Sequence, residues 1–369
     1  MFRSVTAAAA AVGLAALTAA PAAAQDARGP LTIVSWGGAY TASQMRAYVN
    51  PFRDTTDRWV TVETYAGGLD EVRRQVASLN VTWDVVDLNL SDAVRGCREG
   101  LLETIPAEIL PPAPDGTPAA EDFMEAALQD CAVGQNVFAT VIGYDPNRLP
   151  QRPESVAAFF NTDDYPGKRG VRSNPRVVLE WALLADGVAP EDVYATLGTD
   201  EGLERAFDRL ESLRGNIVWW DAPDEAVDLL DRGRVVMTQT YNGRVQDAMD
   251  RGADYEILWD GAVRDVELWG IPKGSRDKQD ALAFIAFASQ PARMAEQARH
   301  IAYGPVRESA LAMLSEDERA DLPTAPQNAR HALWADEDWW AENQDRINAR
   351  MAQWRGGGPL MTPLKGTAR

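Results

Sequence analysis

The chain has 369 residues, of which 46% are hydrophobic and 25% charged, a composition typical of a globular protein with room for about two domains. The formal net charge of −19 argues against binding to nucleic acid, because a phosphate backbone is bound by a basic surface. The only histidines, His300 and His331, and the only cysteines, Cys97 and Cys131, form no zinc-binding spacing, so no metal or cofactor is expected.

The first 24 residues have the pattern of a secretory signal peptide. Arg3 precedes a run of small apolar residues from Thr6 to Ala20, and Ala22 and Ala24 fit a cleavage site. We therefore predict that residues 1–24 are removed on export. An oxidising compartment favours one disulfide, between Cys97 and Cys131, over the alternative of two buried free thiols.

The residues after the signal peptide alternate between strand and helix patterns. Strands are predicted at 31–36, 60–65, 83–87, 135–144, 170–172, 217–220, 235–241, 257–259 and 265–271. Helices are predicted at 41–55, 69–79, 91–99, 177–185, 190–197, 199–213, 224–232, 243–250, 277–288, 291–299, 309–314 and 336–354. Strands separated by helices are typical of α/β proteins with mainly parallel sheets.

Two of these strands, 135–144 and 265–271, are long enough to cross between two α/β blocks. We therefore expect two lobes with a cleft between them, which could close around a ligand by a hinge motion. The expected first lobe comprises residues 25–142 and 266–306. The second comprises 143–265 and 307–355, and residues 356–369 are expected to form a loose tail.

Aromatic and polar residues follow several of the predicted strands, where ligands of α/β proteins bind. Trp36 and Tyr40 flank Gly37 and Gly38, and Asn89 follows the third strand. The glycine pair is either a plain turn between strand and helix or part of a cleft wall. The N–H groups of the helix that begins there would favour an anion.

Further candidates lie in the second half of the chain. Glu267 stands between apolar residues on a strand, facing either solvent or a cleft whose aromatic rings would suit an ammonium group. Tyr241 ends a strand, and Arg244 after it could bind a carboxylate. The remaining candidates are Tyr303 at a helix-to-turn break, Glu180, which is either solvent-exposed or a ligand-binding acid, and Asp221, which either caps a helix or binds the ligand.

Six motifs, in this order along the chain, resemble those of the spermidine/putrescine-binding group of extracellular solute-binding proteins of ABC importers. They occupy residues 36–40, 83–86, 165–170, 236–243, 269–273 and 303–306. The resemblance implies an α/β, two-lobed periplasmic-binding-protein fold with mixed sheets, hinge strands and an interlobe cleft. It also implies a monomeric periplasmic receptor without catalytic residues, which captures one solute for a membrane permease.

In that group, aromatic side chains sandwich the methylene chain of the ligand and acids hold its ammonium ends. Trp36, Tyr40 and Tyr303 match aromatic positions, Tyr241 stands where the group has a Trp, and Glu267 stands where it has an Asp. The sequence departs from the group at Asn89 and Ser91, which replace a Ser/Tyr pair, and at residues 173–175, which lack an acid.

The predicted function is therefore capture of a small cationic amine such as putrescine or spermidine. The departures leave open a shorter amine or an amino-acid-like solute that engages Arg244. The first alternative is a receptor for an amino acid or other small carboxylate, held by the N–H groups of Gly37 and Gly38 and by Arg244. A remote alternative is a secreted hydrolase with paired carboxylates such as Asp84 and Asp87, whose spacing points them to opposite faces of a strand.

Overall fold

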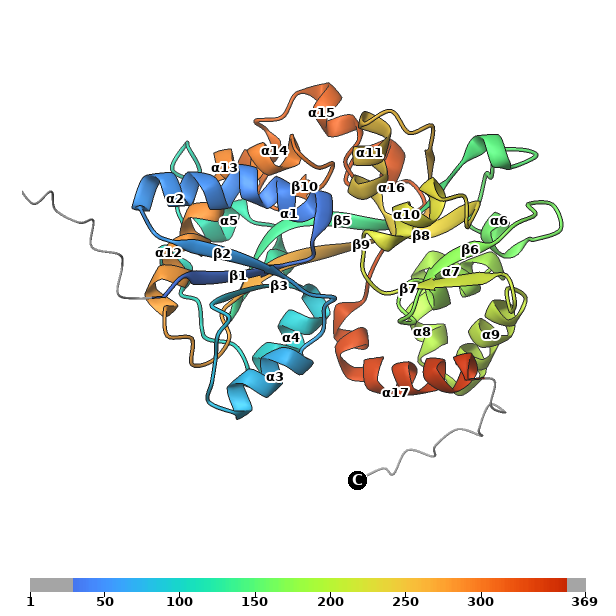
Figure 1. Cartoon of the computed structure of the whole chain (residues 1–369), viewed down its shortest axis with the longest axis horizontal. Coiled ribbons are helices and arrows are strands. Elements are labelled where there is room, and N and C mark those ends of the chain that lie inside the picture. Colours follow the sequence, from blue (N-terminus) through green and yellow to red (C-terminus); the bar gives the residue numbers. More distant parts are fainter. Residues whose placement is uncertain (1–28, 357–369) are drawn as a thin grey trace, which may run out of the picture.

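The computed structural model describes residues 29–356, so the predicted signal peptide and nearly all of the predicted tail lie outside the described residues. The chain forms a two-lobed α/β fold (Figure 1). One mixed sheet runs through both lobes in the strand order β2-β1-β3-β9-β5-β8-β6-β7. The sheet is continuous because two of its strands, β5 and β9, belong to both lobes.

The strands of the described residues alternate with helices along most of the chain. The strands are β1 Leu31–Ser35, β2 Val60–Thr64, β3 Val85–Asn89, β4 Leu128–Gln129, β5 Ala132–Tyr144, β6 Arg169–Arg172, β7 Ile217–Trp220, β8 Met237–Tyr241, β9 Glu256–Gly270, β10 Gly304–Pro305 and β11 Leu333–Trp334. Parallel pairing joins β1 to β2 and β3 in one lobe, and β6 to β7 and β8 in the other.

Helices cover the sheet on both sides. They are α1 Gly38–Gln44, continued by a π-helical turn at Met45–Val49 and by α2 Asn50–Thr56, then α3 Asp70–Ala77, α4 Leu90–Arg98, α5 Ala119–Asp122, α6 Ala157–Phe160, α7 Val178–Ala185, α8 Val193–Leu197, α9 Asp200–Glu211, α10 Glu225–Asp231, α11 Asn242–Asp250, α12 Lys278–Ala288, α13 Pro291–Ala298, α14 Glu308–Leu311, α15 Glu316–Ala320, α16 Pro326–Ala329 and α17 Glu337–Arg355. In Figure 1, α1 and α2 lie above strands β1–β3, and α3 and α4 lie below them.

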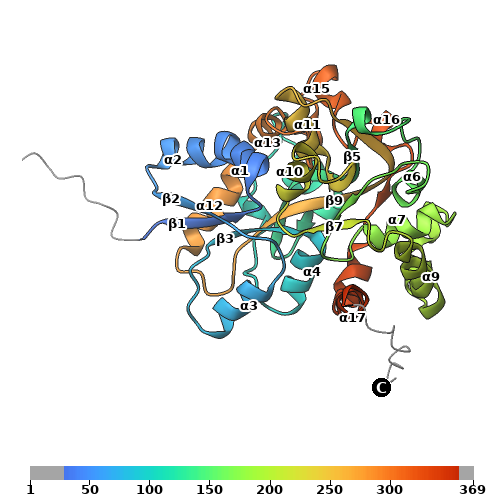
Figure 2. The ribbon, with the colours of Figure 1, turned by 45° about the vertical axis from the view of Figure 1, so that its right-hand side comes forward.

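The long strands β5 and β9 form the connection between the lobes. They pair antiparallel from Ala132 opposite Gly270 to Tyr144 opposite Glu256 (Figures 1 and 2). The prediction of two separate strands at 257–259 and 265–271 is wrong, because β9 is continuous. Gly261 has φ +74° and is accommodated where the pairing register shifts between Thr140 and Ile142.

The apolar core has two main parts, one on each side of this connection. One is built from residues between 31 and 137 and between 266 and 310. The other is built from residues between 142 and 263 and between 333 and 354. The lobe boundaries given above stay predictions.

Helix α17 bridges the lobes at the lower side of the view in Figure 1. Arg95 and Arg98 of α4 form ion pairs with Asp345 and Asp338 of α17 at 2.6 Å each. At its other end, α17 joins α9, where Trp354 Nε1 donates to Glu211. No helix of residues 29–356 is both long and apolar enough to span a membrane.

The predicted disulfide between Cys97 and Cys131 is confirmed, with the two Cα atoms 5.9 Å apart. It ties the end of α4 to the residue just before β5, across 34 residues of chain. In the chain-entropy view, a loop of this length stabilises the fold by about 4 kcal/mol.

We predict that a Cys97→Ala, Cys131→Ala double variant lowers the free energy of unfolding by about 3–4 kcal/mol, because the unfolded chain regains the entropy of the open loop. Urea unfolding followed by tryptophan fluorescence measures this loss. Dithiothreitol should destabilise the unaltered protein by a similar amount and leave the double variant unchanged. An equal effect of reductant on both proteins would contradict the prediction.

Candidate functional site

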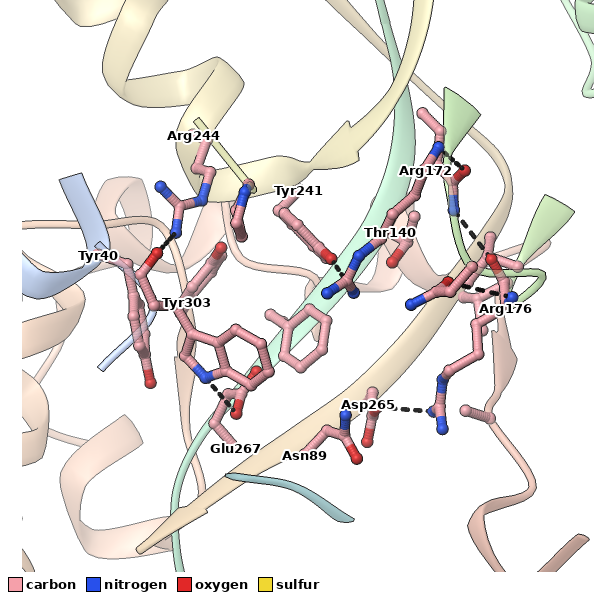
Figure 3. Close-up of a pocket in the computed structure, with 18 of the residues that line it drawn as sticks. Tyr40, Asn89, Thr140, Arg172, Arg176, Tyr241, Arg244, Asp265, Glu267 and Tyr303 are labelled. Atoms are coloured by element: carbon pink, nitrogen blue, oxygen red, sulfur yellow. Dashed lines mark hydrogen bonds and ion pairs between the residues drawn. The ribbon is translucent and has the colours of Figure 1, made fainter. Parts of the chain in front are cut away.

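A pocket of about 660 Å³, part of it open to solvent, lies between the lobes beside β5 and β9 (Figure 3). This size is typical of small-molecule sites. All but one of the candidate residues line it: Trp36, Tyr40, Asn89, Glu180, Tyr241, Arg244, Glu267 and Tyr303. The exception is Asp221, which is exposed and is not part of the lining.

Aromatic side chains form one wall of the pocket. Trp36, Tyr40, Phe138 and Tyr303 pack together with Ile301 in a group separate from both lobe cores, and Tyr241 joins this group at its edge. The ring centroids of Tyr40 and Tyr303 are 5.5 Å apart, and those of Phe138 and Tyr241 are 5.6 Å apart. Rings at such distances offer an apolar surface with negative faces to a bound chain of methylene groups.

Glu267 lies on the cleft face of its strand, next to this wall. Its exposed fraction is 7%, and its Oε2 atom accepts a hydrogen bond of 3.0 Å from Trp36 Nε1. Burial raises the pKa of Glu267 well above its usual value, and the nearby charges of Asp87 and Asp265 raise it further. A carboxyl group in this setting gains from the arrival of a positive charge.

Arg172, at the carboxyl end of β6, lines the opposite part of the pocket and was not among the candidates. Its guanidinium carbon is 6.0 Å from the ring centre of Trp36 and 5.8 Å from that of Trp220. Its Nη1 donates to the hydroxyl of Tyr241 at 2.8 Å, and its Nη2 to the carbonyl of Ala66 at 3.1 Å. Within residues 29–356, no carboxylate forms an ion pair with Arg172.

Arg176 also lines the pocket, but carboxylates already neutralise it. Its Nη2 lies 3.1 Å from Asp265 Oδ2 and 2.6 Å from Glu337 Oε1, and its Nη1 donates to Ser91 Oγ at 2.5 Å. These contacts join β9, α17 and α4 to the segment before α7. Burial alone would lower the pKa of Arg176, but the charges of Glu337 and then Asp265 outweigh it and raise this pKa, so Arg176 stays charged.

Arg244, the candidate for binding a carboxylate, forms an ion pair with Asp224. The Asp224 carboxylate also lies against Gly37 and Gly38, so closely that a Cβ atom at Gly38 would collide with it. The anion position that the sequence suggested at Gly37, Gly38 and Arg244 is thus filled by a carboxylate of the chain itself. A ligand carboxylate at this point would meet a like charge.

The other candidates divide between structural and pocket roles. Asn89 caps α4, where its Oδ1 accepts from the backbone N–H of Asp92 at 2.9 Å. Glu180 is fully buried and accepts at Oε1 from Trp340 Nε1 and from the Tyr194 hydroxyl. The expectation that Asp221 caps a helix is wrong, because α10 begins later, with Asp224 at its N-cap.

Two polar atoms of the lining, Glu180 Oε2 and Arg244 Nε, are buried without a hydrogen-bond partner among the described residues. Buried polar atoms are rarely left unpaired in folded proteins. Such atoms suit a ligand that is itself polar. No group of three His, Cys, Asp or Glu residues within 29–356 is arranged to hold a metal ion.

Comparison with known proteins assigns the chain to a family. Residues 47–327 match the family described as bacterial extracellular solute-binding protein. A curated relative from Pseudomonas aeruginosa, the gamma-aminobutyric acid-binding protein, is 40% identical over 342 residues, which are 93% of this chain and 94% of that protein. The spermidine/putrescine-binding periplasmic protein of Escherichia coli K12 is 24% identical over 193 residues, covering 51% of this chain and 53% of the relative.

Solved structures with the same fold include two binding proteins with named ligands. One is a periplasmic binding protein of A. tumefaciens R10 in complex with agropinic acid, 30% identical with a TM-score of 0.80, covering 88% of this chain and 98% of that one. The other is a GABA receptor, 26% identical with a TM-score of 0.76, covering 92% of this chain and 100% of that one. The predicted periplasmic-binding-protein fold is therefore confirmed.

We predict that Gly38→Ala lowers the free energy of unfolding by about 2–3 kcal/mol. The new Cβ atom displaces Asp224 from Arg244, and the residue is held at a left-handed φ of +54°. Gly68→Ala is the matched control, since Gly68 has φ +83° and open space around its Cα atom. It should lose only about 1 kcal/mol. If urea unfolding shows equal losses of unfolding free energy in the two variants, Asp224 does not lie against Gly38.

Proposed function

Since this chain belongs to the bacterial extracellular solute-binding protein family, we propose that it captures a small amino acid whose ammonium and carboxylate groups are separated by a short methylene chain, as in γ-aminobutyrate. The chain is a solute-binding receptor of the ABC-transporter type and not an enzyme. The nature of its ligand is inferred from the charges that line the pocket.

The observation that carries this proposal is Arg172. Its guanidinium group is a pocket cation with aromatic and neutral partners, whereas Arg176 and Arg244 are neutralised by acids of the chain. A guanidinium group binds a carboxylate with two parallel hydrogen bonds. The hydroxyl of Tyr241, which accepts from Arg172, can donate its own hydrogen to the same carboxylate.

The ammonium end of the ligand is assigned to the acidic side of the pocket. Glu267 and Asp265 stand two residues apart on β9 and therefore share a face of the strand. Trp36 lies between the two poles, since it stacks near Arg172 and donates to Glu267. Its ring, with those of Phe138 and Tyr303, would cover the methylene groups of the ligand.

This proposal differs from the polyamine interpretation of the sequence. A diamine such as putrescine would bring its second ammonium group to Arg172, where two like charges repel each other. The extended match to a gamma-aminobutyric acid-binding protein supports the amino-acid alternative, whereas the match to spermidine/putrescine-binding proteins covers about half of either chain. An amino-acid receptor, the alternative that the sequence left open, is therefore better supported than a polyamine receptor. In this proposal Arg172, and not Arg244, binds the carboxylate of the ligand.

The setting of the receptor is also inferred. We infer that the chain acts as a monomer in the periplasm and delivers its ligand to the membrane permease of an ABC importer. The names of the curated relatives support this location, and the predicted signal peptide at residues 1–24 lies outside the described residues. Closure of the lobes over the ligand would exclude water and give the permease a shape to recognise.

A thermal-shift panel tests the class of ligand. We expect γ-aminobutyrate to raise the melting temperature, because a ligand that binds only the folded state stabilises it. Butylamine and butyrate, which each lack one of the two charged groups, should raise it little, and putrescine should not raise it. A shift with putrescine and none with γ-aminobutyrate would overturn the proposal and restore the polyamine interpretation.

Substitution of the pocket cation tests the role of Arg172. We expect Arg172→Met to weaken γ-aminobutyrate binding about 100-fold in calorimetry, the equivalent of about 3 kcal/mol for lost charge-assisted hydrogen bonds. Arg355→Met is the matched control, because Arg355 also stacks on an indole, that of Trp219, and also donates to a backbone carbonyl. Arg355 does not line the pocket, so affinity should stay within twofold. Equal effects of the two substitutions would remove Arg172 from the site.

A further inference from the structure

A buried pair of carboxyl groups lies beneath the aromatic wall of the pocket. Asp87 on β3 and Glu267 on β9 come from neighbouring antiparallel strands, in which Asp87 pairs with Trp269 and Asn89 with Glu267. Asp87 and Glu267 are therefore diagonal neighbours on one face of the sheet. Asp87 is fully buried, and Glu267 is 7% exposed.

Neutral groups hold the two carboxyls in place. Trp36 Nε1 donates to Glu267 Oε2 at 3.0 Å, and Gln44 Nε2 donates to Asp87 Oδ2 at 2.6 Å. The hydroxyl of Tyr65 donates to the backbone carbonyl of Asp87. Asp87 Oδ1 meets no N–H or O–H donor among the described residues.

No cation within residues 29–356 forms an ion pair with either carboxyl. Arg176 is held by Asp265 and Glu337, and Arg244 by Asp224. Arg172 lies over the ring of Trp36. The other titratable groups facing the pair are the phenols of Tyr40, Tyr48, Tyr65 and Tyr303 and the carboxyl of Asp265. None of these groups brings a positive charge.

Two buried carboxyl groups that are neighbours on one face of a sheet cannot both ionise at low cost unless a cation joins them. We propose that Asp87 is a positioning residue that shares a proton with Glu267, and that the ammonium group of the captured ligand replaces one proton of this pair. The inference rests on the proposed function, because it needs a ligand that carries an ammonium group.

Binding of the ligand releases one proton from the pair of carboxyl groups. In mildly acid solution both carboxyl groups of the free protein are protonated. The ligand's ammonium group, with a pKa near 10, keeps its own protons throughout. When it reaches Glu267, one O–H bond of the pair breaks and the proton passes to solvent. The carboxylate formed binds the ammonium group, and the second proton stays between Asp87 and Glu267.

The pKa values of the two carboxyl groups in the free protein give the direction in which ligand affinity changes with pH. Burial raises the pKa of Asp87 to about 7. Burial, and then the charges of Asp87 and Asp265, raise the pKa of Glu267. A bound ammonium group favours the ionised form and lowers these values again. Ligand affinity therefore rises about tenfold per pH unit up to about pH 7 and levels off above it.

Calorimetry with γ-aminobutyrate at pH 6, in two buffers of different ionisation enthalpy, counts the protons released. We expect nearly one proton at pH 6 and close to none at pH 8.5. Binding without proton release at pH 6 would overturn the proton-sharing pair and leave the proposed function intact. Absence of γ-aminobutyrate binding at either pH would instead overturn the proposed function.

The variant Asp87→Asn distinguishes a role of Asp87 in proton sharing from a purely structural role. The amide keeps an acceptor for Gln44 but removes the proton that Asp87 would share with the carboxylate of Glu267, so the pH at which affinity levels off should rise by about one unit or more. Asp84→Asn is the matched control, since Asp84 is a buried acid just before β3 that accepts from Thr32 N and Ser275 Oγ. Its pH profile should match that of the unaltered protein. An unchanged profile in Asp87→Asn would overturn the role of Asp87, and the proton count on the unaltered protein tests the pair even if this variant does not fold.

Discussion

The interface between the lobes contains a half-buried guanidinium group, that of Arg172, which lies between aromatic rings without an acid of residues 29–356 to neutralise it. The same interface contains two other arginines that have acidic partners, Arg176 and Arg244. The buried acids Asp87 and Glu267, in turn, are neighbours on one face of the sheet, and neither forms an ion pair with a cation of residues 29–356. The charges of the pocket are thus separated into a positive and a negative side. Such separation is tolerable when a ligand carries the complementary charges.

The hinge strands explain why capture and closure are linked. Both strands that join the lobes also contribute to the pocket: Phe138 and Thr140 lie on β5, and Asp265 and Glu267 lie on β9. Phe138 pairs directly with Asp265 across the ladder. A ligand that contacts these side chains therefore rests on the segment about which the lobes would move. Under the proposed function, Arg172 and Trp36 would contact it from opposite lobes, so that the bound ligand and the closed arrangement would stabilise each other.

Much of this arrangement could be predicted from the sequence, because it depends on local patterns. Alternating strands and helices indicated the two α/β blocks, and aromatic residues after strands, such as Trp36 and Tyr241, indicated the pocket wall. The role of the arginines could not be predicted. Arg244 and Arg172 both follow strand ends, and only the position of Asp224, twenty residues before Arg244, distinguishes them. Which acid neutralises which arginine is decided by packing between distant segments, and no spacing rule describes it.

The segment before α7 shows how the charged network also fixes the backbone. Val177 lines the pocket at φ +70° and ψ −42°, a conformation that a β-branched residue rarely adopts. The preceding residue, Arg176, is bound by Ser91, Asp265 and Glu337 from three other elements. Val177 is the N-cap of α7, whose first turn carries the buried Glu180 beside the pocket. A backbone conformation of this kind costs about 1–3 kcal/mol and persists only where its surroundings fix it. The three contacts of Arg176 are surroundings of that kind, so the charged network beside the pocket also stabilises the start of α7.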